Sequence, residues 1–133
     1  MKFFLRKKVY AAAAAALTLV WVLLYANRYH IYRCLPARDG GELVLSGGVL
    51  VDRVAHQPFS GRARLKNGEQ TLVLSYDEGR PDGLGVACQD GRIKEIVNWK
   101  KGRRDGKFMS LENGHPHVSG TYRQNAKNGE WIQ

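Results

Sequence analysis

Hydrophobic and polar residues follow two different patterns along this chain. The 18 residues from Val9 to Ala26 carry no charge. As a helix rising about 1.5 Å per residue, this run would be roughly 27 Å long, close to the ~30 Å hydrocarbon thickness of a bilayer. From Gly41 onward, apolar and polar residues alternate in short runs separated by glycines, which is typical of half-buried β-strands. The pattern predicts one transmembrane α-helix followed by an all-β module.

Basic residues lie on both sides of the apolar run, and the first acidic residue is Asp39. The flank before the run holds Lys2, Arg6, Lys7 and Lys8, and the flank after it holds Arg28, Arg33 and Arg38. Lys and Arg are enriched on the cytoplasmic side of membrane helices. We therefore expect a single-pass protein of the inner (plasma) membrane, with a cytoplasmic N-terminus and a periplasmic or extracellular C-terminal module.

A cleaved signal sequence and a lipidated cysteine are the alternatives to an uncleaved anchor. Signal cleavage needs small residues at positions −3 and −1, and a site after Ala26 would place Leu24 at −3. Lipidation at Cys34 would need a small residue before it, where Arg33 stands. We therefore expect the helix to remain attached as a signal anchor.

The net charge of +9 is concentrated near the apolar run. Of the 21 basic residues, six precede Cys34, so 15 bases face all 12 acids in the rest of the chain. A nucleic-acid-binding module of this size would carry a clearer basic excess on its folded part. The sequence therefore argues against a nucleic-acid partner.

Glycines and aromatic residues recur every 23 residues, the kind of fixed period that announces a repeat architecture. The positions that keep this interval are Gly68, Gly91 and Gly114; Tyr76, Trp99 and Tyr122; and Gly83, Gly106 and Gly129. Gly79 and Gly102 share a further column with Asn125, and Ser60-Gly61 continues the series upstream with a slip of one residue. Asn-Gly and Asp-Gly between short alternating runs favour type I′ hairpin turns. Each unit is therefore predicted to be one β-hairpin, and the second glycine cluster to turn the chain into the next.

Alignment at this period also predicts which side chains share a face. Ala63, Val86 and Met109 fall in one column, and Leu65, Cys88 and Leu111 fall two residues later. We expect these columns to form one continuous apolar face, and the Tyr76, Trp99 and Tyr122 rings to stack as a ladder along the array.

We divide the chain into five segments on this basis. They are a basic cytoplasmic N-terminus (1–8), the membrane helix (9–26), a juxtamembrane linker (27–40), an N-terminal capping hairpin (41–57) and the hairpin repeats (58–133), about three full units plus a truncated fourth. Arrays of this kind need a cap because each repeat contacts only its neighbours.

The Tyr/Trp-x-x-Gly-x-x-Asp/Asn-Gly signature, joined to an Asn/Asp-Gly turn at a period of 23, resembles the bacterial MORN-repeat variant. It is similar to YwqK-type antitoxins, and the segment Pro58-Phe59-Ser60-Gly61 looks like the entry to such arrays. The resemblance implies an elongated array of antiparallel hairpins that acts as an interaction scaffold. It implies binding and neutralising a protein partner such as a toxin, as an immunity protein does, and it brings no catalytic residues.

Basic side chains on the predicted array are the candidate partner contacts: Arg62, Arg64, Arg92, Lys94, Lys100, Lys101, Arg103, Arg104 and Lys107. The cluster from Lys100 to Lys107 falls at the predicted turn between the second and third hairpins. A solvated turn explains that cluster without any ligand, whereas docking to an acidic protein surface or to anionic lipid head groups gives it a role. The second reading for the whole chain is accordingly an envelope scaffold or membrane-apposition module that binds lipid.

Neither an enzyme nor a cofactor protein is indicated. His115 and His117 lack a third ligand at metal-binding spacing, no Ser-His-Asp arrangement is signalled, and the acidic residues fall mainly at turns. Cys34 and Cys88 would be available for a disulfide in an oxidising compartment, but the column of Cys88 favours a buried small hydrophobe. We expect no catalytic, metal or cofactor site.

Overall fold

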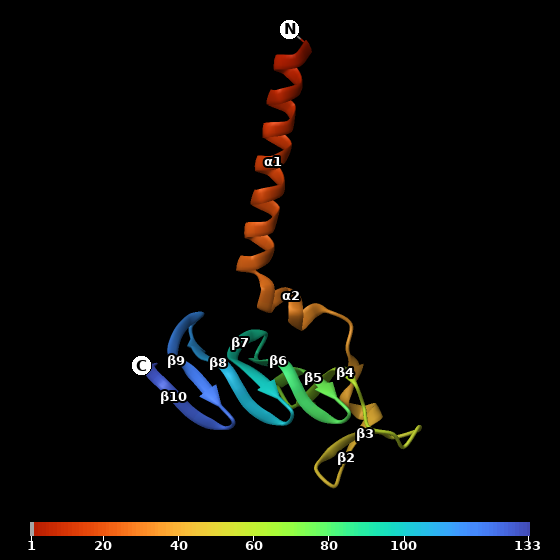
Figure 1. Ribbon diagram of the computed structural model, residues 1–133. Helices are drawn as coiled ribbons and strands as arrows, with labels where there is room; N and C mark the ends of the chain where they lie inside the picture. Colours follow the sequence, from red (N-terminus) through yellow and green to blue (C-terminus); the bar gives the residue numbers. More distant parts are fainter. Residues whose placement is uncertain (1) are drawn as a thin grey trace. The chain divides into compact units, whose positions relative to one another are not determined.

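The computed structural model describes the backbone of residues 2–133 and the side chains from Arg6 onward (Figure 1). It divides into two compact units, Met1–Cys34 and Leu35–Gln133. The first unit is helical and the second is built almost entirely of strands. The fold class expected from the sequence, hairpins preceded by one apolar helix, is therefore confirmed.

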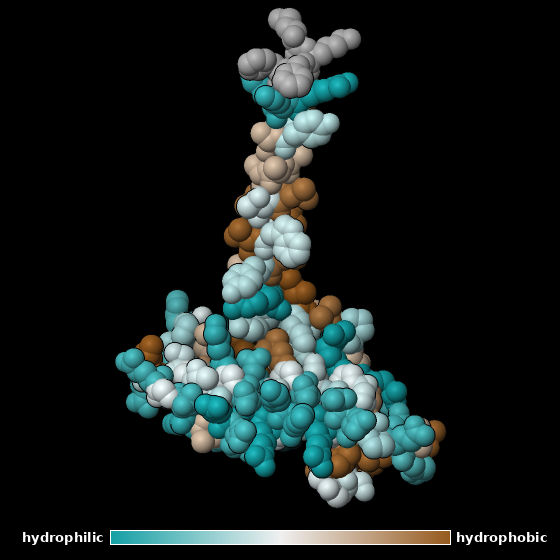
Figure 2. Space-filling view, in the orientation of Figure 1, coloured by the Kyte–Doolittle hydropathy of each residue, from teal (hydrophilic) through white to brown (hydrophobic). Residues whose placement is uncertain are grey.

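The helical unit contains α1 (Lys2–Ala26) and the short α2 (Arg28–Cys34). Within α1, the stretch Arg6–Ala26 is long and apolar enough to cross a membrane, and Figure 2 shows hydrophobic side chains along it. Asn27 ends α1 and bonds back to it, with Nδ2 donating to Leu23 O at 2.9 Å. Part of the expected linker is thus helical, because seven residues after Asn27 form another two turns.

The guanidinium of Arg28 is held by two tyrosines at this junction. It lies 4.1 Å from the ring centroid of Tyr25 and 4.4 Å from that of Tyr29. It also donates to the Tyr25 carbonyl and to the Tyr29 hydroxyl. Tyrosines and an arginine at the end of an apolar helix suit the boundary between hydrocarbon and water.

The strand unit is a meander of one main sheet, in the order β1-β4-β5-β6-β7-β8-β9-β10. Each strand from β4 to β10 pairs antiparallel with its neighbour in sequence, and β1 pairs parallel with β4. The bounds are β1 (Arg38–Asp39), β4 (Gly61–Asn67), β5 (Gln70–Asp77), β6 (Arg80–Gln89), β7 (Arg92–Lys100), β8 (Arg103–Glu112), β9 (His115–Arg123) and β10 (Ala126–Ile132). A 3₁₀ turn, η1 (Gly40–Glu42), follows β1.

A separate hairpin of β2 (Leu43–Ser46) and β3 (Val49–Asp52) lies at the β4 end of the sheet. It buries Leu43 and Leu50 in a small core with Phe59 and Ala63. Leu50 N donates to Gly79 O at 2.8 Å, which fixes the hairpin to the turn between β5 and β6. The region expected to cap the array is therefore a hairpin packed against its first strands.

The turns explain why the glycine columns recur. Asp90-Gly91 and Asn113-Gly114 have positive φ at both residues, which is the type I′ turn expected from their sequence. The opposite ends of the strands turn in the same way, at Glu78-Gly79, Lys101-Gly102 and Gln124-Asn125. Asn125 replaces glycine in its column because asparagine tolerates positive φ better than most residues. The sheet is consequently a continuous meander with tight turns at both ends.

Gly83 and Gly106 have another role. Between the pairs Leu74–Gly85 and Tyr76–Pro81, a single residue of β5 faces three residues of β6. Gly83 lies in this bulge with φ of 104°, and Gly106 lies in the corresponding bulge of β8 with φ of 106°. These glycines therefore allow the strands to bulge, and the turn itself is made by the preceding glycine column.

The first hairpin is out of step with the others by one residue. Its two loop residues are Gly68 and Glu69, and only Gly68 has positive φ, whereas the second loop is Asp90-Gly91. Leu65 consequently lies level with Ala87, through Leu72, and is not level with Cys88.

The expected continuous apolar columns are wrong in this first unit. Ala63 pairs through Leu74 with Gly85, whereas Val86 pairs with Val73 on one side and Ile96 on the other. Since directly paired residues point to the same face of a sheet, Ala63 and Val86 lie on opposite faces. The sheet thus has two apolar faces: one with Leu65, Leu72, Ala87 and Val97, here called the groove face, and one with Val73, Val86 and Ile96.

Candidate binding groove

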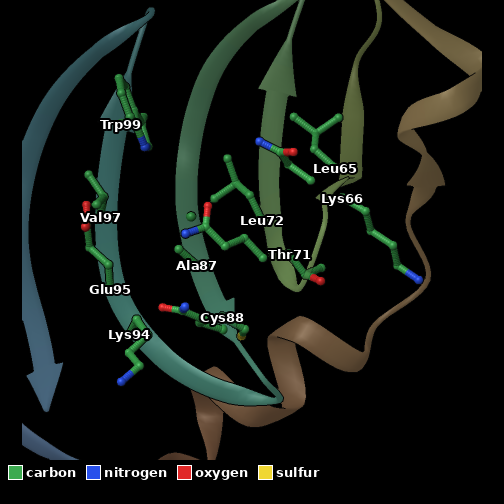
Figure 3. A pocket seen from close by; sticks show the side chains of 14 residues that line it. Leu65, Lys66, Thr71, Leu72, Ala87, Cys88, Lys94, Glu95, Val97 and Trp99 are labelled. Atoms are coloured by element: carbon green, nitrogen blue, oxygen red, sulfur yellow. The ribbon is translucent and has the colours of Figure 1, made fainter.

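The groove face is hollowed between β4 and β7 into a space of about 480 Å³ (Figure 3). Four consecutive strands line it. Its apolar residues are Leu65, Leu72, Gly85, Ala87, Cys88, Val97 and Trp99, and its polar residues are Lys66, Asn67, Gln70, Thr71, Gln89, Lys94 and Glu95. An apolar concavity with a few polar groups is the usual form of a ligand or partner site.

Small residues on β6 make room for the groove. Gly85 and Ala87 lie between the larger side chains of β5 and β7, and Gly85 could not be larger without disturbing its neighbours. A Cβ atom on Gly85 would lie 2.9 Å from Leu74 Cδ1 and 3.3 Å from Trp99 Nε1. The Trp99 indole therefore closes one end of the space by packing against this glycine (Figure 3).

The polar rim comes from the ends of the strands, where the chain turns at Gly68 and Gly91. Lys66 and Lys94 extend their ammonium groups away from the apolar side chains (Figure 3). The three ion pairs found among the described residues leave out both lysines and Glu95. These charges at the rim are thus not neutralised by an ion pair within the described part of the chain.

The aromatic column does not form the ladder expected from its spacing. The Tyr76 ring contacts Phe59, with centroids 6.4 Å apart, and Tyr122 packs edge to face on Trp131 at 4.9 Å. The guanidinium of Arg104 lies between two members of the column, 5.7 Å from Trp99 and 5.4 Å from Tyr122. The rings are therefore linked by other side chains and not by stacking on one another.

Burial also raises the pKa of the Tyr76 hydroxyl above its ordinary value.

The nine basic residues proposed as partner contacts are dispersed over the module. Arg62 Nε donates to Pro36 O at 3.2 Å and Arg64 donates to Leu35 O at 3.4 Å, so both hold the segment before β1. The Arg104 guanidinium lies over aromatic rings, and Lys94 is the one residue of these nine that lines the groove. The remaining five are exposed: Arg92, Lys100, Lys101, Arg103 and Lys107.

Most of the groove residues were missed by sequence reasoning. Leu72, Gly85 and Ala87 were not singled out, and Leu65 and Trp99 were assigned only structural roles. One signal was available, since Ser60-Gly61 already shows the slip of one residue that brings Leu65 level with Ala87. The small size of Gly85 and Ala87 between rows of larger residues was the other.

The described residues contain few candidates for a metal site or a reactive thiol. No group of three or more His, Cys, Asp or Glu side chains there is placed to hold a metal ion. His117 Nδ1 lies 3.7 Å from Glu112 Oε2 at an exposed hairpin end. Cys34 is exposed and Cys88 is buried.

Comparison with known proteins adds no relative. The chain matches no protein-family model, no curated protein and no solved structure. The groove, the apolar helix and the repeat pattern are therefore the features that bear on function.

Proposed function

We propose that this chain is a membrane-anchored, non-catalytic module that binds a protein partner in its groove. The groove carries the proposal: four consecutive strands supply an apolar floor, and polar side chains surround it. Protein interfaces have this arrangement, in which a well-packed apolar centre supplies most of the affinity and a polar rim excludes water. Trp99 is the expected energetic centre, because large aromatic side chains dominate such interfaces.

Membrane anchoring is proposed from α1 and its flanks. Arg6–Ala26 has the length and composition of a membrane span. The basic residues before its uncharged part, which begins at Val9, outnumber those after it and support a cytoplasmic N-terminus, with the strand module in the periplasm or outside the cell. A phosphatase and a fluorescent reporter, each fused after Gln133, test this topology. An active phosphatase with a dark fluorescent reporter is expected, and the reverse pair of signals would contradict it.

The resemblance to MORN-repeat variants and YwqK-type antitoxins supports a narrower form of the proposal. In that form the chain is an immunity protein or antitoxin that neutralises a toxin at the cell envelope. Cells that produce the chain should then survive a toxin that kills cells without it. A variant with a blocked groove should lose that protection while still accumulating in the membrane.

The groove itself is tested by capture from native membranes. Ala87→Trp fills the space from its floor, and Thr121→Ala is the matched control because Thr121 is exposed and does not line the groove. We expect the control to recover the same partner as the natural chain. Recovery with Ala87→Trp should fall at least about tenfold, which corresponds to roughly 1.4 kcal/mol of binding free energy. Equal recovery by both variants would contradict groove binding.

Anionic lipid head groups are a second candidate partner, favoured by the β7–β8 turn. Lys100, Lys101 and Arg103 are exposed there, and none takes part in an ion pair found among the described residues. The full chain in neutral nanodiscs can be mixed with vesicles that contain phosphatidylserine. Binding that falls with added salt and with Lys101→Glu would support this candidate. Binding that is insensitive to both would exclude it.

A further inference from the structure

The β2–β3 hairpin exposes apolar side chains that the core leaves uncovered. Leu43 and Leu50 are 4 % and 6 % exposed, whereas Leu45 is 70 % exposed and Val44 is 42 % exposed. Figure 2 shows hydrophobic side chains gathered at this hairpin within a mostly hydrophilic surface of the strand unit. Exposed apolar patches on such a surface mark contacts with proteins or with membranes.

The hairpin is apolar on both of its faces and carries no charge. The nine residues 43–51 include no Asp, Glu, Lys, Arg or His, and one serine provides their only polar side chain. Val44 pairs with Val51 on one face, and Leu45 pairs with Leu50 on the other. A protein-docking surface surrounds its apolar centre with polar and charged groups that bind the partner. The lack of such groups on this tip favours lipid over protein.

The hairpin also pairs its own backbone. Four residue pairs, from Leu43–Asp52 to Ser46–Val49, join the two strands. Lipid offers no hydrogen bonds, so an element that enters a bilayer must satisfy its backbone groups internally. From Val44 to Gly47 the strand extends by roughly 10 Å. Interfacial elements bury their apolar residues about 5–10 Å into the boundary between head groups and acyl chains, so only the tip needs to enter.

The tether between α1 and the strand unit is short. Residues 27–37, which are 11 residues, separate α1 from β1, and seven of them form α2. Seven helical residues extend about 10 Å and the other four at most about 14 Å, so the tether reaches at most about 25 Å. Tethering raises the effective concentration of the membrane that the tip can meet. The anchoring membrane is therefore always near the hairpin, whereas a protein partner must diffuse to it.

We propose that the tip of the β2–β3 hairpin enters the surface of the membrane in which α1 is anchored, with Val44 and Leu45 among the acyl chains next to the head groups. The inference rests on the membrane anchoring in the proposed function. It adds a second contact with the same bilayer, made by the strand unit. Because the tip is uncharged, this contact needs no anionic lipid and should not weaken with added salt.

Electron paramagnetic resonance of spin-labelled full chains measures the depth of the tip. The chains carry Cys34→Ser, Cys88→Ala and one new cysteine: Leu45→Cys at the tip, Thr121→Cys as the exposed control, or Ala15→Cys within α1. Each is placed in neutral phosphatidylcholine nanodiscs at one chain per disc, which excludes a second copy and a protein partner. Oxygen concentrates in lipid, whereas a nickel chelate stays in water. We expect the ratio of oxygen to nickel collisions to be at least about threefold higher at residue 45 than at residue 121, and highest at residue 15.

A charge at the tip provides a second test. The spin label is placed at Ser46→Cys, and Leu45→Asp or the matched Thr121→Asp is added. Leu45 and Ser46 are exposed, so these changes leave the core intact. A carboxylate is costly among acyl chains, so Leu45→Asp should raise nickel accessibility at residue 46 at least about threefold, and Thr121→Asp should leave it unchanged. Equal ratios at residues 45 and 121, or no effect of Leu45→Asp, would overturn the proposal.

The label in α1 separates this inference from the proposed function. A lipid-protected label at residue 15 together with a water-exposed label at residue 45 overturns the hairpin contact alone and leaves the anchor in place. A water-exposed label at residue 15 overturns the membrane anchoring, and the hairpin contact with it.

Discussion

The indole nitrogen of Trp99 lies against Gly85, where a Cβ atom would be only 3.3 Å away. Trp99 belongs to the aromatic column of the repeat, and Gly85 lies opposite Val97 on the neighbouring strand. The pair links the repeat pattern to the groove, because a side chain at residue 85 would come into tight contact with the Trp99 indole. An aromatic residue of the repeat pattern therefore also shapes the groove.

Substitution of Gly85 should destabilise the strand module. Gly85→Ala places a methyl group 2.9 Å from Leu74 Cδ1, and Leu74 is itself buried. Overpacking of this kind costs about 1–3 kcal/mol of unfolding free energy. Urea denaturation followed by tryptophan fluorescence measures the change. Gly41→Ala is the control, because its nearest contact would be Asp39 Oδ1 at 3.7 Å, and a larger effect from the control would contradict the packing.

In the third unit, Asn125 occupies the position that Gly79 and Gly102 hold in the first two units. Its φ is 70°, its backbone N–H donates to Arg104 O at 2.9 Å, and its side-chain Oδ1 accepts from Arg104 N at 2.8 Å. Asn125→Ala loses the side-chain bond and keeps the unfavourable backbone, so we expect a loss of about 1–3 kcal/mol in unfolding free energy.

Asn125→Gly serves as the comparison for that change. Glycine restores an easy positive φ but not the bond to Arg104 N, so its cost should be smaller than that of alanine. Thermal unfolding of both variants measures the order. Alanine and glycine variants of equal stability would show that the left-handed backbone is not the cause.

Asp52 should make the strand unit sensitive to acid. Amides of Ala55 and Val54 donate to its carboxylate, and Arg38 pairs with it, so the pKa of Asp52 lies below its ordinary value of 3.8. A lowered pKa means that the stabilisation is fully present above pH 3.8 and is lost as pH falls through the folded-state value. Arg38, whose pKa is raised, stays charged throughout this range.

Unfolding measured between pH 5 and pH 2 tests this dependence. The natural chain should lose stability in the acid part of this range, and Asp52→Asn should show a flatter profile there. Glu42→Gln is a useful comparison, since Glu42 also pairs with Arg38 but its carboxylate accepts no bond from a backbone amide of the described residues. Parallel profiles for the natural chain and Asp52→Asn would contradict the role of Asp52.

The two cysteines should differ in reactivity. Cys34 is exposed, whereas Cys88 is 8 % exposed and lies on β6 beside the buried Val86. A thiol reagent applied to the folded chain should therefore modify Cys34 much faster than Cys88. Mass spectrometry of the alkylated protein gives both rates. Similar rates in the folded state, and not only after denaturation, would place Cys88 at the surface.

Local sequence predicted the hairpins well and the faces of the first hairpin poorly. Asp90-Gly91 and Asn113-Gly114 specify their turns because both residues accept positive φ. Asn67-Gly68 has the same appearance, yet its loop is Gly68-Glu69. A shift of one residue reverses every side chain of a strand, so Leu65 could not be assigned to its face from the column alone.

The groove could not be predicted from the sequence for the same reason. Its floor joins Leu65 of the first unit to Ala87 of the second, and these residues do not share a column at a period of 23. The basic residues could be identified from the sequence because their charge does not depend on how the strands pair. Of the nine basic residues proposed as partner contacts, only Lys94 lies on the groove. The others contact the segment before β1, lie over aromatic rings or are exposed to solvent.

Site-specific photo-cross-linking in living cells tests groove binding most directly. A photoreactive residue at Glu95, which pairs with Ala87, would sit in the groove, and one at Thr121 would sit outside it. We expect light to attach a second polypeptide to the chain from position 95 and not from position 121, and Ala87→Trp to abolish that adduct. Adducts of equal yield from both positions, or an adduct from position 95 that survives Ala87→Trp, would contradict a partner site in the groove.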